Sequence, residues 1–269
     1  MKFFGFGLVA LVIASFSAYA TAINVDLGTA DPFAVLAGST VTNTGPTTIH
    51  GSLGLWPGTA ITGFPPGSVS GGTIHATDAV AMQAQHDLTT AYNFAAGEVC
   101  NGNLTGQDLG GLALTSGVYC FDSSAQLTGT LILDAQGNSN AVFVFQIGST
   151  LTTASSSSVV FANGGQGDSV FWQVGSSATL GTTTTFQGNI LALTSITLAT
   201  DAKIGCGRAL ARNGAVTLDT NNVSIDTEGC ETSTGGGGAS VPEPATASLL
   251  LLIGAPALLW LRRSKSVRN

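Results

Sequence analysis

A four-residue pattern, Thr-Leu-x-Thr, recurs in the second half of the chain and constrains the fold more than any other feature. Its copies begin 29, 18 and 20 residues apart, at Thr150, Thr179, Thr197 and Thr217. Repeats of about twenty residues, each with room for three short strands, are typical of a β-solenoid. One coil of a solenoid cannot bury its own apolar side, and stacking the coils buries it. The pattern therefore predicts a mostly β fold of stacked coils with uneven loops.

The pleat of a strand gives each residue of this pattern a direction, because successive side chains point to opposite faces. We expect the leucines to form an inward ladder: Leu151, Leu180, Leu198 and Leu218. We expect the first threonines to form a column on the outside: Thr150, Thr179, Thr197 and Thr217. Asp219 occupies an outward position in the last repeat and interrupts the array there.

Near-continuous apolar segments alternate with these repeats and need cover on both faces. They span residues 141–147, 169–174, 189–193 and 208–211. One candidate for the cover is a helix over about 77–97, with Thr77 or Asp78 as its N-cap and Gly97 at its end. About twenty residues at ~1.5 Å each match about six coils at ~4.8 Å, so one helix would cover the stack along its axis.

The charge balance excludes a nucleic-acid-binding protein. Charged residues make up 9% of the chain, against about 25% in an average soluble domain. Residues 21–240 contain three basic residues and fourteen acidic ones, which gives this region a net charge of −11. A surface of that sign repels phosphate.

The two ends of the chain resemble addressing signals. Residues 1–20 have the basic start, the apolar run and the Ala18-Tyr19-Ala20 site of a secretory signal peptide, which leaves 21–232 as the folded domain. A Gly-rich linker over 233–240 precedes the 241–269 tail. This tail opens with Val241, Pro242, Glu243 and Pro244, continues as an apolar segment over about 245–261, and ends in a basic cluster.

The three parts of the tail together resemble the PEP-CTERM sorting signal of Gram-negative bacteria. That resemblance implies transient membrane anchoring by the C-terminal helix and cleavage by an exosortase-type enzyme. It also implies export to the extracellular space, the cell surface or the exopolysaccharide matrix. A plain C-terminal membrane anchor is the alternative.

The chain has an even number of cysteines, which is consistent with disulfide formation in an exported protein: Cys100, Cys120, Cys206 and Cys230. None lies in a C-x-x-C pair, and proximity in sequence favours the pairing Cys100–Cys120 and Cys206–Cys230, with free buried thiols as the alternative. We predict no enzyme, no cofactor and no metal site. The three histidines are scattered, the Gly-rich stretches lack the lysine of a phosphate-binding loop, and the acids are spread over turns rather than paired.

Several longer segments resemble the DUF3494 ice-binding protein family. They cover residues 33–45, 104–111, 117–121, 170–175, 188–193 and 207–218, within a match from about 27 to 226. The resemblance implies a discontinuous right-handed parallel β-solenoid of triangular section, with one long α-helix packed along the axis. It also implies adsorption to ice through a flat face, which gives thermal hysteresis and inhibits ice recrystallisation.

We expect the ice face to be the Thr-rich one, because threonine carries a stiff χ1, a methyl group and a hydroxyl. Its residues are Thr150, Thr152, Thr153, Thr179, Thr182, Thr197, Thr200, Thr217 and Thr220. The second candidate is the neighbouring face, with Ser157, Thr184 and Thr185, which Lys203 interrupts. Threonines also favour exposed strands for purely structural reasons.

Two functions compete on the sequence alone. The first is a secreted or surface ice-binding protein, acting as a monomer on the ice crystal. The second is a non-catalytic exopolysaccharide-matrix or adhesin-like surface protein, for which exposed aromatic platforms would be evidence.

Overall fold

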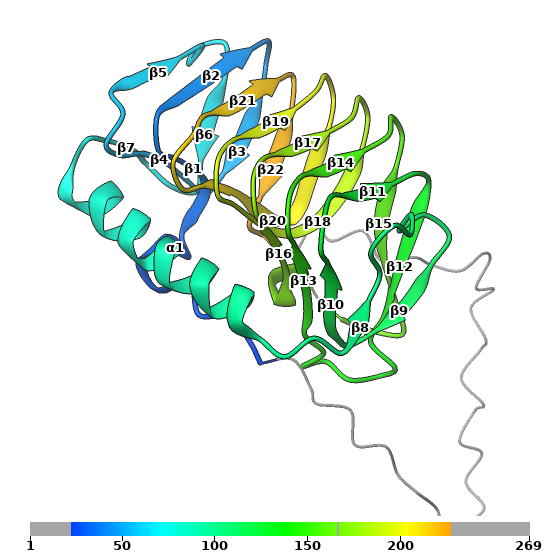
Figure 1. The fold of residues 1–269 in the computed structure, drawn as a ribbon. Helices are drawn as coiled ribbons and strands as arrows, with labels where there is room; N and C mark the ends of the chain where they lie inside the picture. The colour runs from blue at the N-terminus through cyan, green and yellow to red at the C-terminus, as the bar shows by residue number, and fades with distance from the viewer. Residues whose placement is uncertain (1–22, 166, 227–269) are drawn as a thin grey trace, which may run out of the picture. The chain divides into compact units, whose positions relative to one another are not determined.

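A computed structural model describes residues 23–165 and 167–226 of the chain. The predicted signal peptide (1–20), Gly-rich linker (233–240) and sorting tail (241–269) lie outside these described residues. Within them, parallel strands form two sheets, and a single α-helix, α1 (Ala79–Gly97), lies alongside (Figure 1). The mostly β architecture with one helix is therefore confirmed.

The strands form three rows, and within each row every strand pairs in parallel with its neighbours. The first row, next to α1, consists of β7 (Ile74–Ala76), β4 (Ser52–Leu55), β1 (Phe33–Ala37), β20 (Lys203–Ala211), β18 (Thr185–Ala192), β16 (Val170–Val174), β13 (Phe143–Ile147), β10 (Gly117–Phe121) and β8 (Gly102–Asn103). The second row is a separate seven-stranded sheet: β5 (Ala60–Thr62), β2 (Thr40–Thr44), β21 (Val216–Asp219), β19 (Ile196–Leu198), β17 (Ala178–Leu180), β14 (Leu151–Thr153) and β11 (Ala125–Leu127).

The third row shares two long strands with the first. It contains β6 (Ser68–Ser70), β3 (Thr48–His50), β22 (Asn222–Ser224), the first halves of β20 and β18, then β15 (Ser158–Ala162), β12 (Thr130–Asp134) and β9 (Ala113–Thr115). The pairing of β18 with β20 shifts register between Gln187 and Asn189, and Gly188 lies at that bend with φ +98°. A Cβ on Gly188 would approach Val170 to 2.7 Å, so glycine is required there. Two short 3-10 helices, η1 (Gly28–Ala30) and η2 (Gly167–Ser169), complete the elements.

The chain does not fill the rows in sequence order. Strands β1–β7 form the coils at one end, α1 leads to the opposite end, and β8–β22 return toward the start. The two segments join where β1 pairs with β20 (Val35 opposite Ala209) and β2 pairs with β21. At this joint the Arg208 guanidinium forms an ion pair with Asp31 at 2.8 Å and donates to Asn189 Oδ1 at 2.8 Å.

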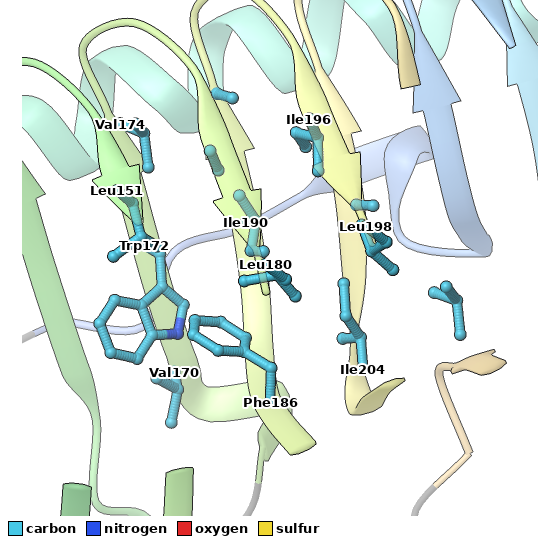
Figure 2. Packing of buried hydrophobic residues seen from close by; sticks show 14 of the residues in the cluster. Leu151, Val170, Trp172, Val174, Leu180, Phe186, Ile190, Ile196, Leu198 and Ile204 are labelled. Carbon is cyan, nitrogen blue, oxygen red and sulfur yellow. The ribbon is translucent and has the colours of Figure 1, made fainter. Parts of the chain in front are cut away.

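The inside of the coils is apolar and closely stacked. Trp172 and Phe145 lie face to face with ring centroids 3.9 Å apart, and the Trp172 Nε1 donates to the Gln187 carbonyl at 3.0 Å. Figure 2 shows Leu151, Leu180 and Leu198 in the same interior. These leucines and Leu218 are buried, as the inward ladder predicts.

The helix covers the outer side of the first row. Leu88 and Ala84 of α1 pack in a second apolar cluster with Leu36, Val144 and other residues of that row. The Asp78 side chain caps α1 by accepting a hydrogen bond from the Ala81 N–H at 2.9 Å. In the described part of the chain, no helix is both long and apolar enough to cross a membrane.

The disulfide between Cys100 and Cys120 is present and ties the end of the helical segment to β10. Cys206 is also disulfide-bonded. Its predicted partner, Cys230, lies outside the described residues, so this second pairing stays a prediction.

Candidate functional site

The seven-stranded sheet has the most regular outer surface among the described residues. Its short strands alternate buried and exposed positions: β11, β14 and β17 each read buried, exposed, buried. The buried positions carry Leu, Ile, Val or Ala, except for Thr153 and Asn43. The apolar interior therefore fixes which side chains face outward.

A single column of side chains runs down the middle of this surface. The strand register places these residues opposite one another in succession: Gln126, Thr152, Thr179, Thr197, Thr217, Thr42 and Thr62. Parallel strands lie about 4.8 Å apart, so six threonines repeat at that spacing. Thr42 and Thr62 come from the N-terminal segment, and their strands extend the column beyond the joint at β21.

Most residues in the flanking columns are also small. The residues two positions before the central column are Ser124, Thr150, Ser177, Ser195, Ala215, Thr40 and Ala60. The residues two positions after it are Thr128, Ala154, Gly181, Ala199, Asp219, Thr44 and Phe64. We call these three columns the threonine face. Asp219 is its one charged residue, and Asp108, which pairs with Gln126, places a second carboxylate just beyond the end of the central column. Phe64 is its one aromatic residue and packs against the apolar interior.

The expected alignment of Thr150 with Thr179 is wrong. Leu151 lies opposite Ala178, so Thr152 stacks on Thr179 and Thr150 lies in the flanking column. There its hydroxyl donates to Ser124 Oγ at 2.8 Å. A shift of two residues keeps Leu151 pointing inward, which is why the pleat alone does not reveal it.

Three predicted face residues are buried and do not belong to any outer surface: Thr153, Ser157 and Thr184. The hydroxyls of Thr153 and Thr184 lie 2.9 Å apart, and Thr153 Oγ1 also accepts from the Gly181 N–H at 2.9 Å. Ser157 Oγ donates to the Leu127 carbonyl at 2.9 Å. These hydroxyls satisfy polar groups inside the coils, so they stabilise the bends rather than contact solvent.

The remaining predicted threonines lie at the corner that follows the threonine face. Thr182 and Thr200 are exposed, and Thr220 is half-buried with φ +56°. Ser156, Thr183 and Asp201 have the same left-handed backbone in preceding coils. One such residue in each of these coils turns the chain sharply, so the corner separates two faces.

The third row, the second candidate, is less uniform. Its outer column consists of Thr130, Ser158, Thr185, Lys203, Asn222, Thr48 and Ser68. Thr185 is half-buried and lies directly opposite the exposed Lys203. The same surface carries Ile132, Val160 and His50. Long and charged side chains therefore interrupt the outer surface of the third row, whereas the central column of the threonine face has six consecutive threonines.

Outside these two faces, no cluster of the described residues has the composition of a metal site, and one Thr–His–Asp series lies before α1, where His75 Nε2 is 2.8 Å from Thr73 Oγ1. No group of three His, Cys, Asp or Glu side chains that could hold a metal ion occurs in the described ranges. His75 Nδ1 lies 2.8 Å from Asp78 at the start of α1, and His50 Nδ1 lies 2.9 Å from Ser70 Oγ. The His86 ring lies 5.7 Å from that of Trp56. The three histidines thus make separate local contacts.

The sequence reasoning missed Gln126, Thr42 and Thr62 of the central column. The alternation Thr40-Val41-Thr42-Asn43-Thr44 was a usable signal, because it places three threonines on one side of a strand. It does not contain the Thr-Leu-x-Thr pattern, and nothing local shows that it pairs with residues 175 positions away.

Comparison with known proteins identifies the family of this chain. Residues 35–224 match the family described as Ice-binding-like. The chain is 57% identical over 259 residues to the "Ice-binding protein" of Nostoc sp. (strain HG1), covering 96% of this chain and 94% of that protein. It is 33% identical over 214 residues to the "Ice-binding protein" of Flavobacterium frigoris (strain PS1), covering 75% of this chain and 76% of that protein.

Two solved structures have the same fold. An ice-binding protein from an Antarctic biological consortium superposes with a TM-score of 0.73 at 49% identity, over 80% of this chain and 96% of that one. The ice-binding protein of the Antarctic ascomycete Antarctomyces psychrotrophicus gives a TM-score of 0.73 at 42% identity, over 76% of this chain and 99% of that one.

Proposed function

This chain belongs to the Ice-binding-like family, and we propose that it adsorbs to ice through the threonine face and so inhibits ice growth and recrystallisation. The observation that carries this proposal is the register that stacks Thr152, Thr179, Thr197, Thr217, Thr42 and Thr62 in one column.

The face has two regular spacings. Outward residues repeat at about 4.8 Å between strands and about 6.7 Å along a strand. Two repeats of this size can match repeats in an ice surface, so the hydroxyls can hold a layer of water in ice-like positions. Each threonine hydroxyl offers one donor and two acceptor sites, which lets it take part in such a layer from either side of a hydrogen bond.

Rigidity is the second requirement, because an array that moves cannot hold ordered water. The β-branched threonine side chain is stiff at χ1. Beneath the column, buried Leu151, Leu180 and Leu198 are packed in the interior that Figure 2 shows, so the strands cannot shift independently. Adsorption of this kind needs no bond to be made or broken, so we assign the face no catalytic role.

We infer that the three rows form a right-handed β-solenoid of triangular section. What supports this is that the chain visits the three rows in turn, as in β13, β14 and β15. The solenoid is discontinuous, since β1 and β20 are neighbours in the stack although α1 and most of the coils separate them in sequence.

We further propose that the chain is exported by its N-terminal signal peptide. We also propose that the tail, beginning at Val241-Pro242-Glu243-Pro244, is a PEP-CTERM signal that anchors it transiently and is cut by an exosortase-type enzyme. The protein then acts as a monomer outside a Gram-negative cell, on the surface or in the exopolysaccharide matrix. The support is the sequence pattern of residues 1–20 and 241–269.

The composition of the threonine face favours ice over a polysaccharide. Sugar-binding surfaces use exposed aromatic rings as platforms, and the three columns carry only Phe64, which is half-buried. Trp56, which directly follows β4, is half-buried and lies near His86 of α1.

The test is an ice-affinity experiment. Ice is grown slowly in a solution of the folded protein, and the protein in the ice is compared with that of an inert protein of similar size. We expect enrichment in the ice, together with thermal hysteresis and inhibition of recrystallisation. Incorporation at the level of the inert protein, with no hysteresis, would overturn the proposal.

A further inference from the structure

Asp219 lies within the threonine face and differs from every other residue of its three columns in carrying a charge. It follows the buried Leu218 in β21, so its side chain points outward, and it pairs with Thr44 of β2. It therefore lies at the joint between the C-terminal and N-terminal coils, with threonine-bearing strands on both sides.

The carboxylate binds two of its neighbours. Its Oδ2 accepts a hydrogen bond from the Thr200 hydroxyl at 2.5 Å, and its Oδ1 accepts from the Thr220 hydroxyl at 3.1 Å. Among the described residues the ion pairs are His75–Asp78 and Arg208–Asp31, so no described basic side chain neutralises Asp219.

These contacts change what this part of the face can offer to water. An ionised carboxylate only accepts hydrogen bonds, whereas a hydroxyl both donates and accepts. The hydroxyls of Thr200 and Thr220 both donate to the Asp219 carboxylate. The side chains of Thr200, Asp219 and Thr220 therefore offer water only hydrogen-bond acceptors. Each water of an ice-like layer must donate as well as accept, so a patch of acceptors orients the water around itself. Removing water from an unpaired charge is also costly.

The local backbone does not depend on the Asp219 side chain. Asn221 holds the turn: its Oδ1 accepts from the Asp219 N–H at 2.6 Å, and its Nδ2 donates to the Ala199 and Ala202 carbonyls at 2.8 and 2.9 Å. A substitution of Asp219 leaves these bonds in place.

We infer that Asp219 limits the ice affinity of this protein, because it interrupts the ordered hydroxyl lattice at the joint between the two chain segments. The inference rests on the proposed function and adds a determinant of its strength. Replacing Asp219 by an uncharged hydroxyl residue frees the donors of Thr200 and Thr220 and makes the lattice continuous from β19 to β2.

The experiment compares Asp219→Thr and Asp219→Asn with the unmodified protein. Asp219→Thr supplies a hydroxyl and a β-branched residue suited to a strand, and Asp219→Asn removes the charge at nearly constant shape. Asp134→Asn, on the third row, is the matched control for the change in net charge. Thermal unfolding establishes that each variant is folded, and ice partitioning and thermal hysteresis are then measured at equal concentration.

We expect the ice partition coefficient of Asp219→Thr to rise about twofold or more, which corresponds to ~0.4 kcal/mol or more of added binding free energy. Asp219→Asn should give a smaller rise, and Asp134→Asn no change. If folded Asp219 variants partition no better than the unmodified protein while that protein still binds ice, the inference is wrong and the proposed function stands. Absence of ice binding in all four proteins overturns the proposed function itself.

Discussion

The hydroxyl oxygens of Thr42 and Thr217 lie 3.4 Å apart across the pairing of β2 with β21, although 175 residues separate them in the chain. Two distant segments thus build one column of threonines. The central surface of the protein is therefore complete only when the N-terminal coils are docked on the last C-terminal coil.

The N-terminal threonines should accordingly matter as much as those of the repeats. We expect Thr42→Tyr to remove most of the thermal hysteresis, because a ring that projects from the middle of the column keeps the flat face away from ice. Thr48→Tyr, on the third row of the same coil, serves as the control and should keep its activity. Equal activity of the two variants would mean that the N-terminal coils lie outside the contact surface.

Adjacent residues Thr152 and Thr153 should respond in opposite ways to the same change. Thr153→Val removes a buried acceptor of the Gly181 N–H, so we expect it to lower the free energy of unfolding by about 1–3 kcal/mol and leave ice binding intact. Thr152→Val alters only an exposed hydroxyl, so stability should stay within about 0.5 kcal/mol while hysteresis falls. Urea unfolding and hysteresis, measured on both variants, check the contrast. A loss of hysteresis in folded Thr153→Val would contradict it.

Arg208 should stabilise the joint between the two segments. Its buried guanidinium donates to the Asp31 carbonyl at 2.7 Å, to the Asp31 carboxylate at 2.8 Å and to Asn189 at 2.8 Å. Arg208→Ala leaves these acceptors without that donor, and we expect a loss of about 2–3 kcal/mol in the free energy of unfolding.

Arg212→Ala is the control for this loss. Arg212 lies over the Tyr92 ring at 4.5 Å and is half-buried, so its removal should cost about 1 kcal/mol or less. Chemical denaturation of both variants gives the comparison. An equal loss in the two would show that Arg208 has no special role at the joint.

Acid should weaken the attachment of the N-terminal loop to α1. The hydroxyl and the N–H of Thr29, with the amide of Gln83, hold the pKa of Asp87 below its ordinary value of 3.8. A lowered pKa in the folded state means that the stabilisation is present above the unfolded value and is lost as the pH falls through the folded one. We expect the melting temperature of Asp87→Asn to lie below that of the unmodified protein at pH 6, and the difference to shrink as the pH falls below about 4. A difference that stays constant with pH would contradict this assignment.

The sequence predicted the inside of the molecule better than its surface. The buried positions of Leu151 and Leu180 follow from the pleat, since each lies between outward neighbours. The helix follows from its apolar spacing, and the residue types limit its N-cap to Thr77 or Asp78, of which the structure shows Asp78. These are local properties, which a single segment of sequence contains.

The surface depends on register and bends, which are not local. The coils differ in length, so aligning them on the motif stacked Thr150 instead of Thr152 on Thr179. The burial of Thr153 and Thr184 follows from their mutual hydrogen bond inside a bend, and their residue type alone predicts exposure. The contribution of Thr42 needs the pairing of β2 with β21, which only the folded chain shows.

The most direct test of the central claim is the thermal hysteresis of Thr197→Tyr, with Thr130→Tyr on the third row as its matched control. Thr197 lies inside the central column, between Thr179 and Thr217, and Thr130 lies outside the threonine face. We predict that Thr197→Tyr loses its hysteresis while it unfolds at the temperature of the unmodified protein, and that Thr130→Tyr keeps its hysteresis. Full hysteresis in folded Thr197→Tyr, or its loss in Thr130→Tyr alone, would show that ice contacts another face.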